Sequence, residues 1–291
     1  MKSVLITGAS KGIGLATALA ASRAGHQVYA TMRNPGGAPE LARIVEKEKL
    51  PVTISAMDVD SDSSVAQTIG RIYESGGRID VLVNNAGVEY VGTVEETPLS
   101  AFRAVMETNY FGPLRCIKAV VPRMKAQRSG HIINVSSVAG RISACPMAPY
   151  AASKWALEGL SEALGQEMKA VNVRVSIVEP GIIATAMARR IGETPEGSSS
   201  SQVRRWSAFF AAALKEPVEP SVVAGKILEL IDGEGWTLRH PVGPSAVPFL
   251  QWRGAMSDEQ WVDWGALDDD AWYQRVQKDF GLDARAHAAK V

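Results

Sequence analysis

The feature that most constrains the fold is a glycine-rich turn between a strand-like and a helix-like segment near the start of the chain. Residues 2–7 are apolar and partly β-branched, and predict a short buried strand. Residues 13–24 predict a helix that ends at Gly25. Between them Gly8, Gly12 and Gly14 follow a spacing that departs from the general GxGxxG pattern. A strand, a glycine turn and a helix N-terminus in this order predict a site for the phosphates of a dinucleotide, and a turn without a ligand is the alternative.

Tyr150 and Lys154 form a second constraint, because residues four apart share one face of a helix. A phenol has a pKa near 10. Lowering that pKa to about 7 requires roughly 4 kcal/mol. A cation about 5 Å away supplies on the order of 3 kcal/mol of this. The pair therefore predicts a tyrosine that exchanges protons beside a lysine, and two residues that merely share a helix surface are the alternative.

The strand and helix pattern then repeats along the chain. Further strands are expected at 26–31, 51–57, 79–83, 131–135 and 173–178, and helices at 38–50, from about 61, at 99–127 with a kink at Gly112-Pro113, and at 150–170. This alternation predicts an α/β fold with a doubly wound parallel sheet in three layers. Ligands gather beyond the carboxyl ends of such strands, where the polar turns of this chain also fall.

Composition excludes several classes of function. The formal net charge is zero, which argues against nucleic acid or an anionic membrane as a partner. No apolar run is long enough for a membrane span, and the four histidines lack metal-ligand spacing, so no metal is expected. Only two cysteines are present, and the first strand leaves no room for a signal peptide. A cytoplasmic location is expected.

The motifs together resemble the short-chain dehydrogenase/reductase family, in its single-domain branch. The resemblance rests on residues 7–14 (TGASKGIG), Asp58-Val59, residues 84–87 (NNAG), Asn109, Ser136-Ser137, Tyr150-x3-Lys154 and Pro180-Gly181-x3-Thr185, and covers about residues 1 to 245. It implies a Rossmann-type fold, a nicotinamide cofactor, and a catalytic tetrad of Asn109, Ser137, Tyr150 and Lys154. Ser137 is chosen over Ser136 because the family's spacing from serine to tyrosine falls on it.

The resemblance also implies roles for individual residues. Ser137 would donate a hydrogen bond to the substrate oxygen, with an ordinary turn serine as the alternative. Lys154 would also hold the nicotinamide ribose. Asn109 would belong to a water-linked proton relay, with a structural helix-breaking role as the alternative. The expected cofactor-binding residues are Gly8, Ser10, Lys11, Gly12, Ile13, Gly14, Arg33, Asp58, Val59, Asn85, Ala86, Gly87, Tyr150, Lys154, Pro180, Gly181, Ile182 and Thr185.

Charge near the end of the second strand favours NADP(H) over NAD(H). NAD sites carry an acidic residue there, whereas this chain has Thr31-Met-Arg33-Asn34. A guanidinium at Arg33 can bind the 2′-phosphate through paired hydrogen bonds, and Lys11 adds a second cation. Ordinary solvated charges are the alternative.

A lid over residues 182–214 is expected to cover the substrate. It holds Met187, Ile191, Trp206, Phe209 and Phe210, which suggest a hydrophobic ketone or aldehyde and the corresponding alcohol, although packing of the lid on the core is equally consistent. Four arginines at 189, 190, 204 and 205 suggest an acidic substrate or, more often, a solvated face. The expected substrate-binding residues are Ser137, Cys145, Met147, Tyr150 and Met187. The pattern most resembles the hydroxysteroid and retinol dehydrogenase branch.

The catalytic domain is expected over residues 1–248, with a tryptophan-rich extension over 249–291 packed on the same domain. Trp252, Trp261, Trp264 and Trp272 lie in this extension, with Ser257 as a candidate helix N-cap. A role at the pocket edge or in a subunit contact is the alternative. The family implies a homodimer or homotetramer, paired through the helices that hold Asn109 and Tyr150. The predicted protein is thus an NADP(H)-dependent oxidoreductase. The alternatives are a catalytically silent NADP-binding sensor or scaffold, and a sugar-nucleotide epimerase or dehydratase.

Overall fold

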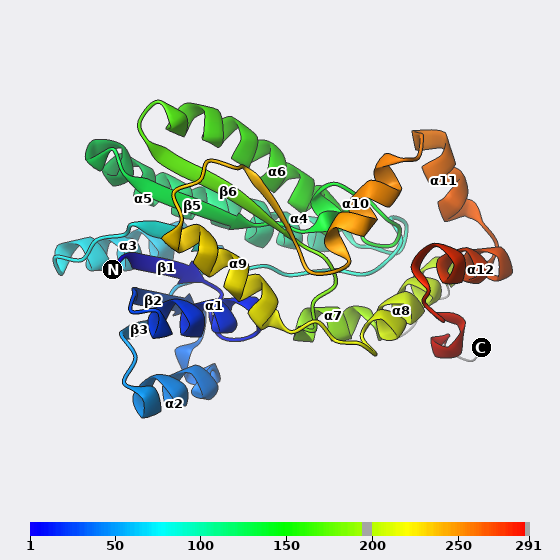
Figure 1. The fold of residues 1–291 in the computed structure, drawn as a ribbon, viewed down its shortest axis with the longest axis horizontal. Coiled ribbons are helices and arrows are strands. Elements are labelled where there is room, and N and C mark those ends of the chain that lie inside the picture. Colours follow the sequence, from blue (N-terminus) through cyan, green and yellow to red (C-terminus); the bar gives the residue numbers. More distant parts are fainter. Residues whose placement is uncertain (194–199, 289–291) are drawn as a thin grey trace.

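The computed structural model describes residues 1–193 and 200–288, and a parallel sheet runs through its centre (Figure 1). Within the described residues the sheet has seven strands in the order β3-β2-β1-β4-β5-β6-β7. They are β1 (Ser3–Thr7), β2 (Gln27–Met32), β3 (Val52–Ala56), β4 (Val81–Asn84), β5 (Gly130–Val135), β6 (Val173–Pro180) and β7 (Arg239–Val242). The order reverses between β1 and β4, which makes the sheet doubly wound. The predicted Rossmann-type fold is confirmed.

Helices cover both faces of the sheet and bury an apolar core on each. On one face lie α1 (Gly12–Arg23), α2 (Pro39–Glu48) and α9 (Pro220–Asp232), whose core side chains include Ala18, Leu41 and Ile227. On the other lie α3 (Asp62–Glu74), α5 (Gly112–Gln127) and α6 (Ala148–Lys169). Helix α4 (Leu99–Met106) packs against α6. The result is the predicted three-layer arrangement.

The helical region predicted over 99–127 is interrupted one residue before the predicted kink. A π-helical turn over Glu107–Phe111 joins α4 to α5, and Gly112 and Pro113 open the second helix. A π-turn adds a residue to the helical repeat and therefore redirects the side chains within it. Asn109 lies inside this turn and is fully buried.

Strand β7 and helix α9 were not expected from the sequence. Strand β7 has only four residues, Arg239 to Val242, and includes a histidine and a proline. It lacks the apolar run that identifies the other strands, and it is held at the edge of the sheet by pairing with β6 alone. A strand defined by its partner in this way cannot be found from local pattern.

The C-terminal helices pack mainly on the lid and extend beyond the carboxyl edge of the sheet (Figure 1). They are α10 (Ala246–Gly254), α11 (Asp258–Ala266) and α12 (Asp269–Phe280), and the lid contributes α7 (Ala186–Ile191) and α8 (Ser201–Ala213). A third apolar cluster joins α8 to the extension through Phe209, Trp264 and Trp272. Residues 194–199 of the expected lid lie outside the described residues, and α10 spans the expected boundary at 248.

The predicted N-cap of α11 is confirmed. The Ser257 hydroxyl accepts a hydrogen bond from the Gln260 backbone at 3.2 Å, and the Gln260 side chain accepts one from the Ser257 backbone at 2.9 Å. This reciprocal capping satisfies two backbone donors at the start of the helix.

Two absences hold for residues 1–193 and 200–288. None of the helices there combines the length and the apolar character needed to cross a bilayer. The same residues contain no group of three or more side chains that could hold a metal ion.

We expect replacement of Gly14 by Ala to destabilise the first turn of α1. An added Cβ would lie 2.3 Å from the Gly8 carbonyl oxygen and 2.5 Å from Asn85 Nδ2. Such overpacking costs about 1–3 kcal/mol. Gly70→Ala in α3 is the matched control, because its Cβ would meet nothing within 4 Å. Urea denaturation should show a lower midpoint for Gly14→Ala and no loss for Gly70→Ala, and equal midpoints for the two variants would contradict this packing.

Candidate active site

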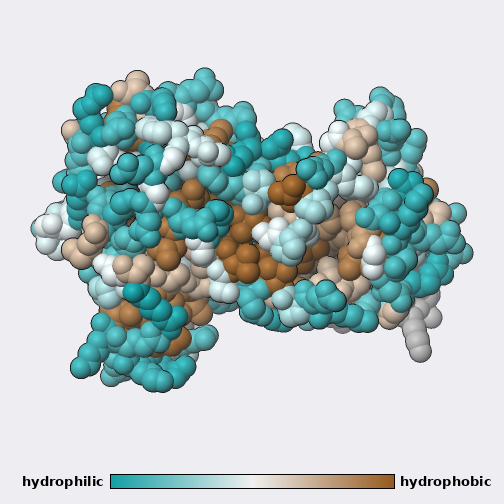
Figure 2. Space-filling model, in the orientation of Figure 1, coloured by the Kyte–Doolittle hydropathy of each residue, from teal (hydrophilic) through white to brown (hydrophobic). Residues whose placement is uncertain are grey.

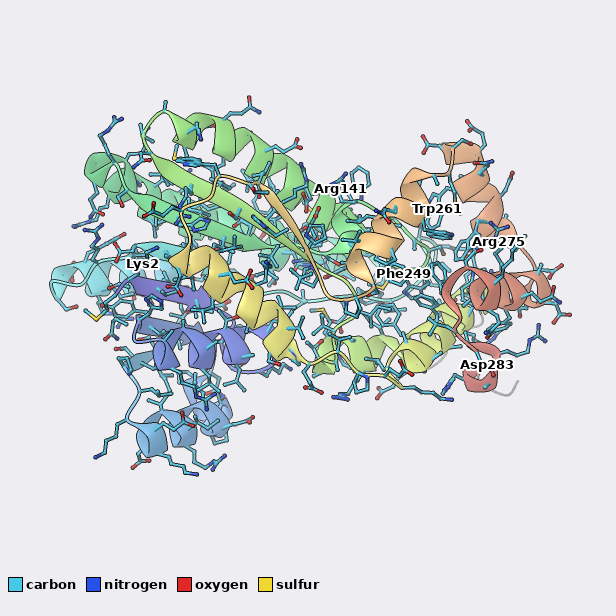
Figure 3. The ribbon with its side chains drawn as sticks, viewed as in Figure 1. Lys2, Arg141, Phe249, Trp261, Arg275 and Asp283 are labelled. Carbon is cyan, nitrogen blue, oxygen red and sulfur yellow. The ribbon has the colours of Figure 1, made fainter. Side chains whose placement is uncertain are left out.

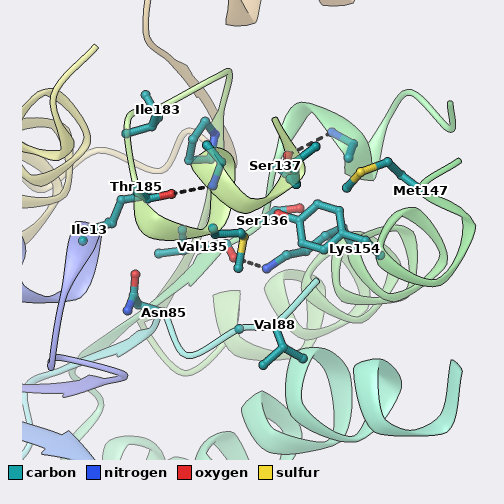
Figure 4. A pocket seen from close by; sticks show the side chains of 18 of the residues that line it. Ile13, Asn85, Val88, Val135, Ser136, Ser137, Met147, Lys154, Ile183 and Thr185 are labelled. Atoms are coloured by element: carbon teal, nitrogen blue, oxygen red, sulfur yellow. Dashed lines mark hydrogen bonds between the residues drawn. The ribbon is translucent and has the colours of Figure 1, made fainter. Parts of the chain in front are cut away.

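A pocket of about 530 Å³ runs from the glycine turn to the C-terminal helices. Figure 4 shows the part of it that lies around Asn85, Ser137 and Lys154. The pocket lies at the carboxyl ends of the strands, as expected for this type of sheet. Most of the predicted site residues line it: Gly8, Ser10, Lys11, Gly12, Ile13, Arg33, Asp58, Val59, Asn85, Ala86, Gly87, Ser137, Met147, Tyr150, Lys154, Pro180, Gly181, Ile182, Thr185 and Met187. Gly14, Asn109 and Cys145 do not line it.

The glycine turn has the shape and the free backbone groups of an anion cradle. Gly8 and Gly12 have φ angles of +67° and +58°, a region that side chains disfavour. A Cβ on Gly8 would also lie 2.8 Å from Ala86 Cα. Helix α1 has no side-chain cap and no acidic residue in its first turn, so its positive end faces the pocket without a protein carboxylate. These features fit the pyrophosphate of a dinucleotide.

Thr7 joins the glycine turn to the turn after β4, a contact that the sequence analysis missed. Its Oγ1 accepts hydrogen bonds from the backbone N–H groups of Asn85 and Ala86, each at 3.0 Å. Asn85 Nδ2 in turn donates to the Thr7 carbonyl at 2.9 Å and to the Gly8 carbonyl at 3.1 Å. The two turns are therefore fixed relative to each other as the floor of the pocket.

Lys154 is a buried ammonium group anchored to the sheet. Its Nζ donates to the Val135 carbonyl at 2.8 Å, and the residue is only 4% exposed (Figure 4). Burial lowers the pKa of Lys154 to about 8, and the nearby Glu158 carboxylate opposes that shift. The group therefore remains mostly protonated at neutral pH.

Tyr150 lies beside Lys154, whose Nζ is 5.7 Å from the centre of the phenol ring. Burial raises the pKa of Tyr150 to about 12, a hydrogen bond with Ser137 lowers it, and Glu89 raises it further. The expectation that Lys154 brings this pKa close to 7 beside a bound nicotinamide stays a prediction. Loss of solvation is the largest cause of the raised pKa, and the ammonium of Lys154 is hydrogen-bonded to the Val135 carbonyl.

The two serines after β5 differ in their surroundings. Ser137 lines the pocket, interacts with Tyr150, and its Oγ accepts a hydrogen bond from the Ala139 backbone at 3.1 Å. Ser136 is buried, and its Oγ has no hydrogen-bond partner. The contact with Tyr150 supports Ser137 as the serine that would meet a substrate oxygen.

Asn109 holds the loop after β4 against α6 and does not line the pocket. Its Oδ1 accepts from the Val88 backbone at 2.9 Å, and its Nδ2 donates to the Val88 carbonyl at 2.8 Å and to Ser153 Oγ at 2.9 Å. Ser153 Oγ donates to the Tyr150 carbonyl at 2.7 Å. The amide of Asn109 thus positions the turn of α6 that carries Tyr150.

Charges of both signs lie at the end of the pocket near β2 and β3. Arg33 and Lys11 are exposed and line it, together with Asp58 and Asp60. Asp60 was not predicted as a site residue; its Oδ2 accepts from Thr108 Oγ1 at 2.9 Å, and its buried Oδ1 has no hydrogen-bond partner. Burial raises the pKa of Asp60, and the positive charge of Arg33 lowers it.

Cys145 does not line the pocket that holds Tyr150, so its contact with a substrate stays a prediction. A turn between Ala144 and Met147, closed by a 2.9 Å backbone hydrogen bond, places the two predicted side chains differently. Met147 is buried against the pocket, whereas Cys145 faces a neighbouring cavity, where its Sγ lies 3.2 Å from Gln202 Oε1.

Aromatic side chains form the wall of the pocket opposite the glycine turn. They come from the lid and from all three C-terminal helices: Trp206, Phe209, Phe210, Phe249, Trp252, Trp261, Trp264 and Phe280. Figure 2 shows hydrophobic residues gathered between the body of the sheet and these helices, and Figure 3 places Phe249 and Trp261 there. Trp252, Trp261 and Trp264 therefore line the pocket and also belong to the cluster that joins the lid to the extension, whereas Trp272 belongs to that cluster without lining the pocket.

Glu89 joins the lid to the site and was not predicted. Its Oε1 accepts a hydrogen bond from Arg190 Nε at 2.9 Å, and its side chain is 7% exposed. Arg190 is therefore engaged in an ion pair and does not belong to a purely solvated face. Because Glu89 raises the pKa of Tyr150, this ion pair lies within electrostatic reach of the phenol.

Comparison with known proteins matches this geometry to one family. A family model described as short chain dehydrogenase matches residues 2–196. Oxidoreductase BOA17 of Botryotinia fuckeliana is 37% identical over 265 residues, which are 88% of this chain and 95% of that protein. Retinol dehydrogenase 8 of Bos taurus is 43% identical over 196 residues, which are 66% of this chain and 62% of that protein.

Solved structures agree in fold. A short-chain dehydrogenase from Streptomyces avermitilis superposes with a TM-score of 0.77 at 32% identity, covering 90% of this chain and 95% of that one. A metagenomic short-chain oxidoreductase, solved in complex with NADP, has a TM-score of 0.67 at 28% identity, covering 83% and 96%.

We expect Tyr150 to titrate above the ordinary tyrosine pKa in the ligand-free protein. Carbon-13 NMR of the phenol Cζ, assigned with Tyr150→Phe, measures this directly. Glu89→Gln should lower the pKa, since it removes a nearby negative charge, and Ser137→Ala should raise it, since it removes a stabilising hydrogen bond. Glu95→Gln, at an exposed position of the same loop, should leave it unchanged. A wild-type pKa of about 10 or less would contradict the burial of this phenol.

Proposed function

Because this chain belongs to the short-chain dehydrogenase/reductase family and is an oxidoreductase of that family, we propose that it interconverts a hydrophobic ketone or aldehyde and its alcohol with NADP(H). One observation carries the proposal. Ser137, Tyr150 and Lys154 lie in the same pocket as the glycine cradle and the aromatic wall. A hydride donor, a proton donor and an apolar substrate would therefore meet in one place.

The residues of the site account for the chemistry of carbonyl reduction. When bound, a nicotinamide would supply a hydride to the carbonyl carbon. Ser137 donates a hydrogen bond to the carbonyl oxygen, where negative charge develops. Tyr150 transfers its phenolic proton to that oxygen, so the carbonyl gains one hydride and one proton and leaves as an alcohol. In the reverse direction the phenolate takes the proton from the alcohol.

Tyr150 holds its proton at neutral pH in the ligand-free site, because burial raises the pKa of the phenol to about 12. The protonated phenol is the form that reduction requires, and the phenolate is the form that oxidation requires. Lys154 keeps a positive charge beside the phenol and would hold the nicotinamide ribose. Asn109 would complete a water-linked relay to that lysine.

The preference for NADP(H) rests on the cations at the β2 end of the pocket. Arg33 and Lys11 both line the pocket and are exposed, so both are available to a 2′-phosphate. The similarity to a structure solved with NADP supports this assignment. Asp60 lies in the same pocket, and the positive charge of Arg33 acts on its carboxylate as well.

The substrate class rests on the aromatic wall. Residues from α8, α10, α11 and α12 present rings to the pocket, and such surfaces bind large apolar molecules. The similarity to retinol dehydrogenase 8 supports a hydrophobic alcohol or carbonyl compound. Met147 and Met187 would complete the contact with the substrate near Tyr150.

We propose a cytoplasmic homodimer or homotetramer that pairs through α4, α5 and α6. Leu99, Phe111 and Trp155 support this surface, since they are 62%, 41% and 51% exposed on those helices and the π-turn. We further propose that residues 249–291 form an extension of a catalytic domain at residues 1–248.

Replacement of Tyr150 by Phe should remove turnover and spare cofactor binding. Loss of a general acid costs about 10²–10⁴-fold in rate. NADPH oxidation with a panel of hydrophobic ketones measures the rate, and calorimetry measures the affinity for NADPH. Tyr73→Phe is the matched control, because this tyrosine lies on α3 and does not line the pocket. Full activity of Tyr150→Phe would place the proton donor elsewhere, and a wild type that binds NADPH but reduces no ketone would indicate a silent sensor.

Replacement of Arg33 by Asp should weaken NADPH binding selectively. Charge-assisted hydrogen bonds contribute about 1.5–3 kcal/mol each, so we expect a loss of at least tenfold in NADPH affinity. NADH affinity should stay the same or rise, because a carboxylate there can bind the ribose hydroxyl groups. Arg43→Asp, at an exposed position of α2 outside the pocket, is the control. Equal losses for both cofactors would show that Arg33 does not contact the 2′-phosphate.

A further inference from the structure

Two buried carboxylates adjoin residues of the proposed active site without lining its pocket. Glu158 follows Lys154 by one turn of α6, and Glu179 directly precedes Pro180 at the end of β6. The two glutamates are 4% and 0% exposed, and no other aspartate or glutamate of the described residues is buried to this extent. Glutamate is almost never fully buried unless it is paired, so the partners of these two side chains carry information.

Arg239 of β7 holds both buried carboxylates. Its Nε lies 2.9 Å from Glu158 Oε2 and 3.6 Å from Glu179 Oε1, and its Nη2 donates to Glu162 Oε1 at 2.7 Å. Arg141 Nη1 adds a donor 3.4 Å from Glu179 Oε1. Three carboxylates therefore share two guanidiniums, and the cluster contains more acidic groups than arginines.

Lys154 supplies a further cation beside this cluster. Residues four apart share one face of a helix, and Lys154 and Glu158 are both on the buried face of α6. Glu158 is also fixed by packing, because a Cβ on Gly140, in the turn after Ser137, would lie only 2.9 Å from its Cγ. Burial lowers the pKa of Lys154, and the Glu158 carboxylate raises it. Little water screens opposite charges in such a place, so the interaction is stronger than at the surface.

The other charged or titratable groups on the elements around α6 have partners of their own or are exposed. Glu107 pairs with Arg115, Glu89 with Arg190, His131 with Ser176, Arg174 with the Gly233 carbonyl and Tyr110 with the ring of Phe111, and Arg103 is exposed. Tyr150 lies one turn before Lys154 on α6 itself. Among these groups Glu158 is the carboxylate that acts on the charge of Lys154.

We propose that Glu158, held in place by Arg239, is a positioning residue that keeps the ammonium of Lys154 charged and so sets the alkaline limit of the reaction. A neutral amine beside Tyr150 would leave the phenolate formed by proton transfer without a neighbouring cation. The proposal rests on the proposed function, because it gives the charge of Lys154 a role in that proton transfer.

Titration of Lys154 tests the first part of the proposal without turnover. The protein is labelled with lysine that carries ¹³C at Cε, the Lys154 resonance is assigned by its absence in Lys154→Met, and its titration is followed by NMR. The wild-type midpoint should lie near pH 8. Glu158→Gln keeps the size of the side chain and an acceptor for Arg239 but removes the charge. Its midpoint should therefore be lower, so that less than half of Lys154 carries a proton at pH 8.

Two further variants separate charge from structure. Glu158→Asp keeps the charge but shortens the side chain, so its midpoint should stay closer to the wild type than that of Glu158→Gln. Glu162→Gln is the matched control, because it removes another carboxylate from Arg239 at a half-exposed position two turns from Lys154, and it should leave the midpoint unchanged. A larger shift for Glu158→Asp than for Glu158→Gln, or equal midpoints throughout, would overturn the proposal. A wild-type midpoint below neutral pH would also overturn it, and this measurement needs no variant.

The pH profile of ketone reduction tests the second part. The kcat/KM for reduction of a hydrophobic ketone with NADPH is measured across the neutral and alkaline range. The alkaline decline should begin at lower pH in Glu158→Gln than in the wild type or Glu162→Gln, so the loss of activity should grow as the pH rises. A lowered Lys154 midpoint with an unchanged profile would overturn the claim that this charge sets the alkaline limit.

Two outcomes distinguish this proposal from the proposed function. Lower Lys154 midpoints in Glu158→Gln without reduction of any ketone by the wild type would overturn the proposed function and support the link between Glu158 and Lys154. Ketone reduction by the wild type and Glu158→Gln with the same profile and the same Lys154 midpoint would support the proposed function and overturn the role of Glu158.

Discussion

The site depends on one buried hydrogen bond, from the ammonium of Lys154 on α6 to the carbonyl of Val135 at the end of β5. A charge in the protein interior is costly unless it is paired, so this contact fixes the helix to the strand end. Tyr150 lies one helical turn before Lys154, and Ser137 follows two residues after Val135. The same contact therefore brings the phenol, the hydroxyl and the ammonium together. The burial that it requires also raises the pKa of the phenol.

The sequence predicted most of the fold because the signals for its strands and turns are local. Apolar strands, the glycine turn and the polar residues after each strand predicted the parallel sheet and the edge at which the pocket lies. Features that depend on distant partners were not predictable in this way. Strand β7 is defined by its pairing with β6, and Glu89 reaches the site through an ion pair with Arg190, a residue far along the chain.

The sequence did not predict how the surroundings of each side chain change its properties in the site. The spacing of Tyr150 and Lys154 placed them together but left out the loss of solvation that dominates the pKa of the phenol. Cys145 precedes α6 by a few residues, yet a turn directs it into the neighbouring cavity. The family model ends at residue 196, whereas the aromatic wall is built from residues beyond 200. The family model thus covers Ser137, Tyr150 and Lys154, and the aromatic rings of the wall follow it in the chain.

Isotope transfer tests the central claim most directly, namely that one pocket delivers a hydride and a phenolic proton to the same carbonyl group. NADPH carrying deuterium on the transferred position of its nicotinamide is incubated with the wild-type protein and an excess of a hydrophobic ketone, and the alcohol is examined by mass spectrometry and proton NMR. We predict one deuterium on the carbinol carbon and none on the hydroxyl group. An alcohol without deuterium at that carbon, or tight NADPH binding with no alcohol from any ketone tried, would contradict this account of the site.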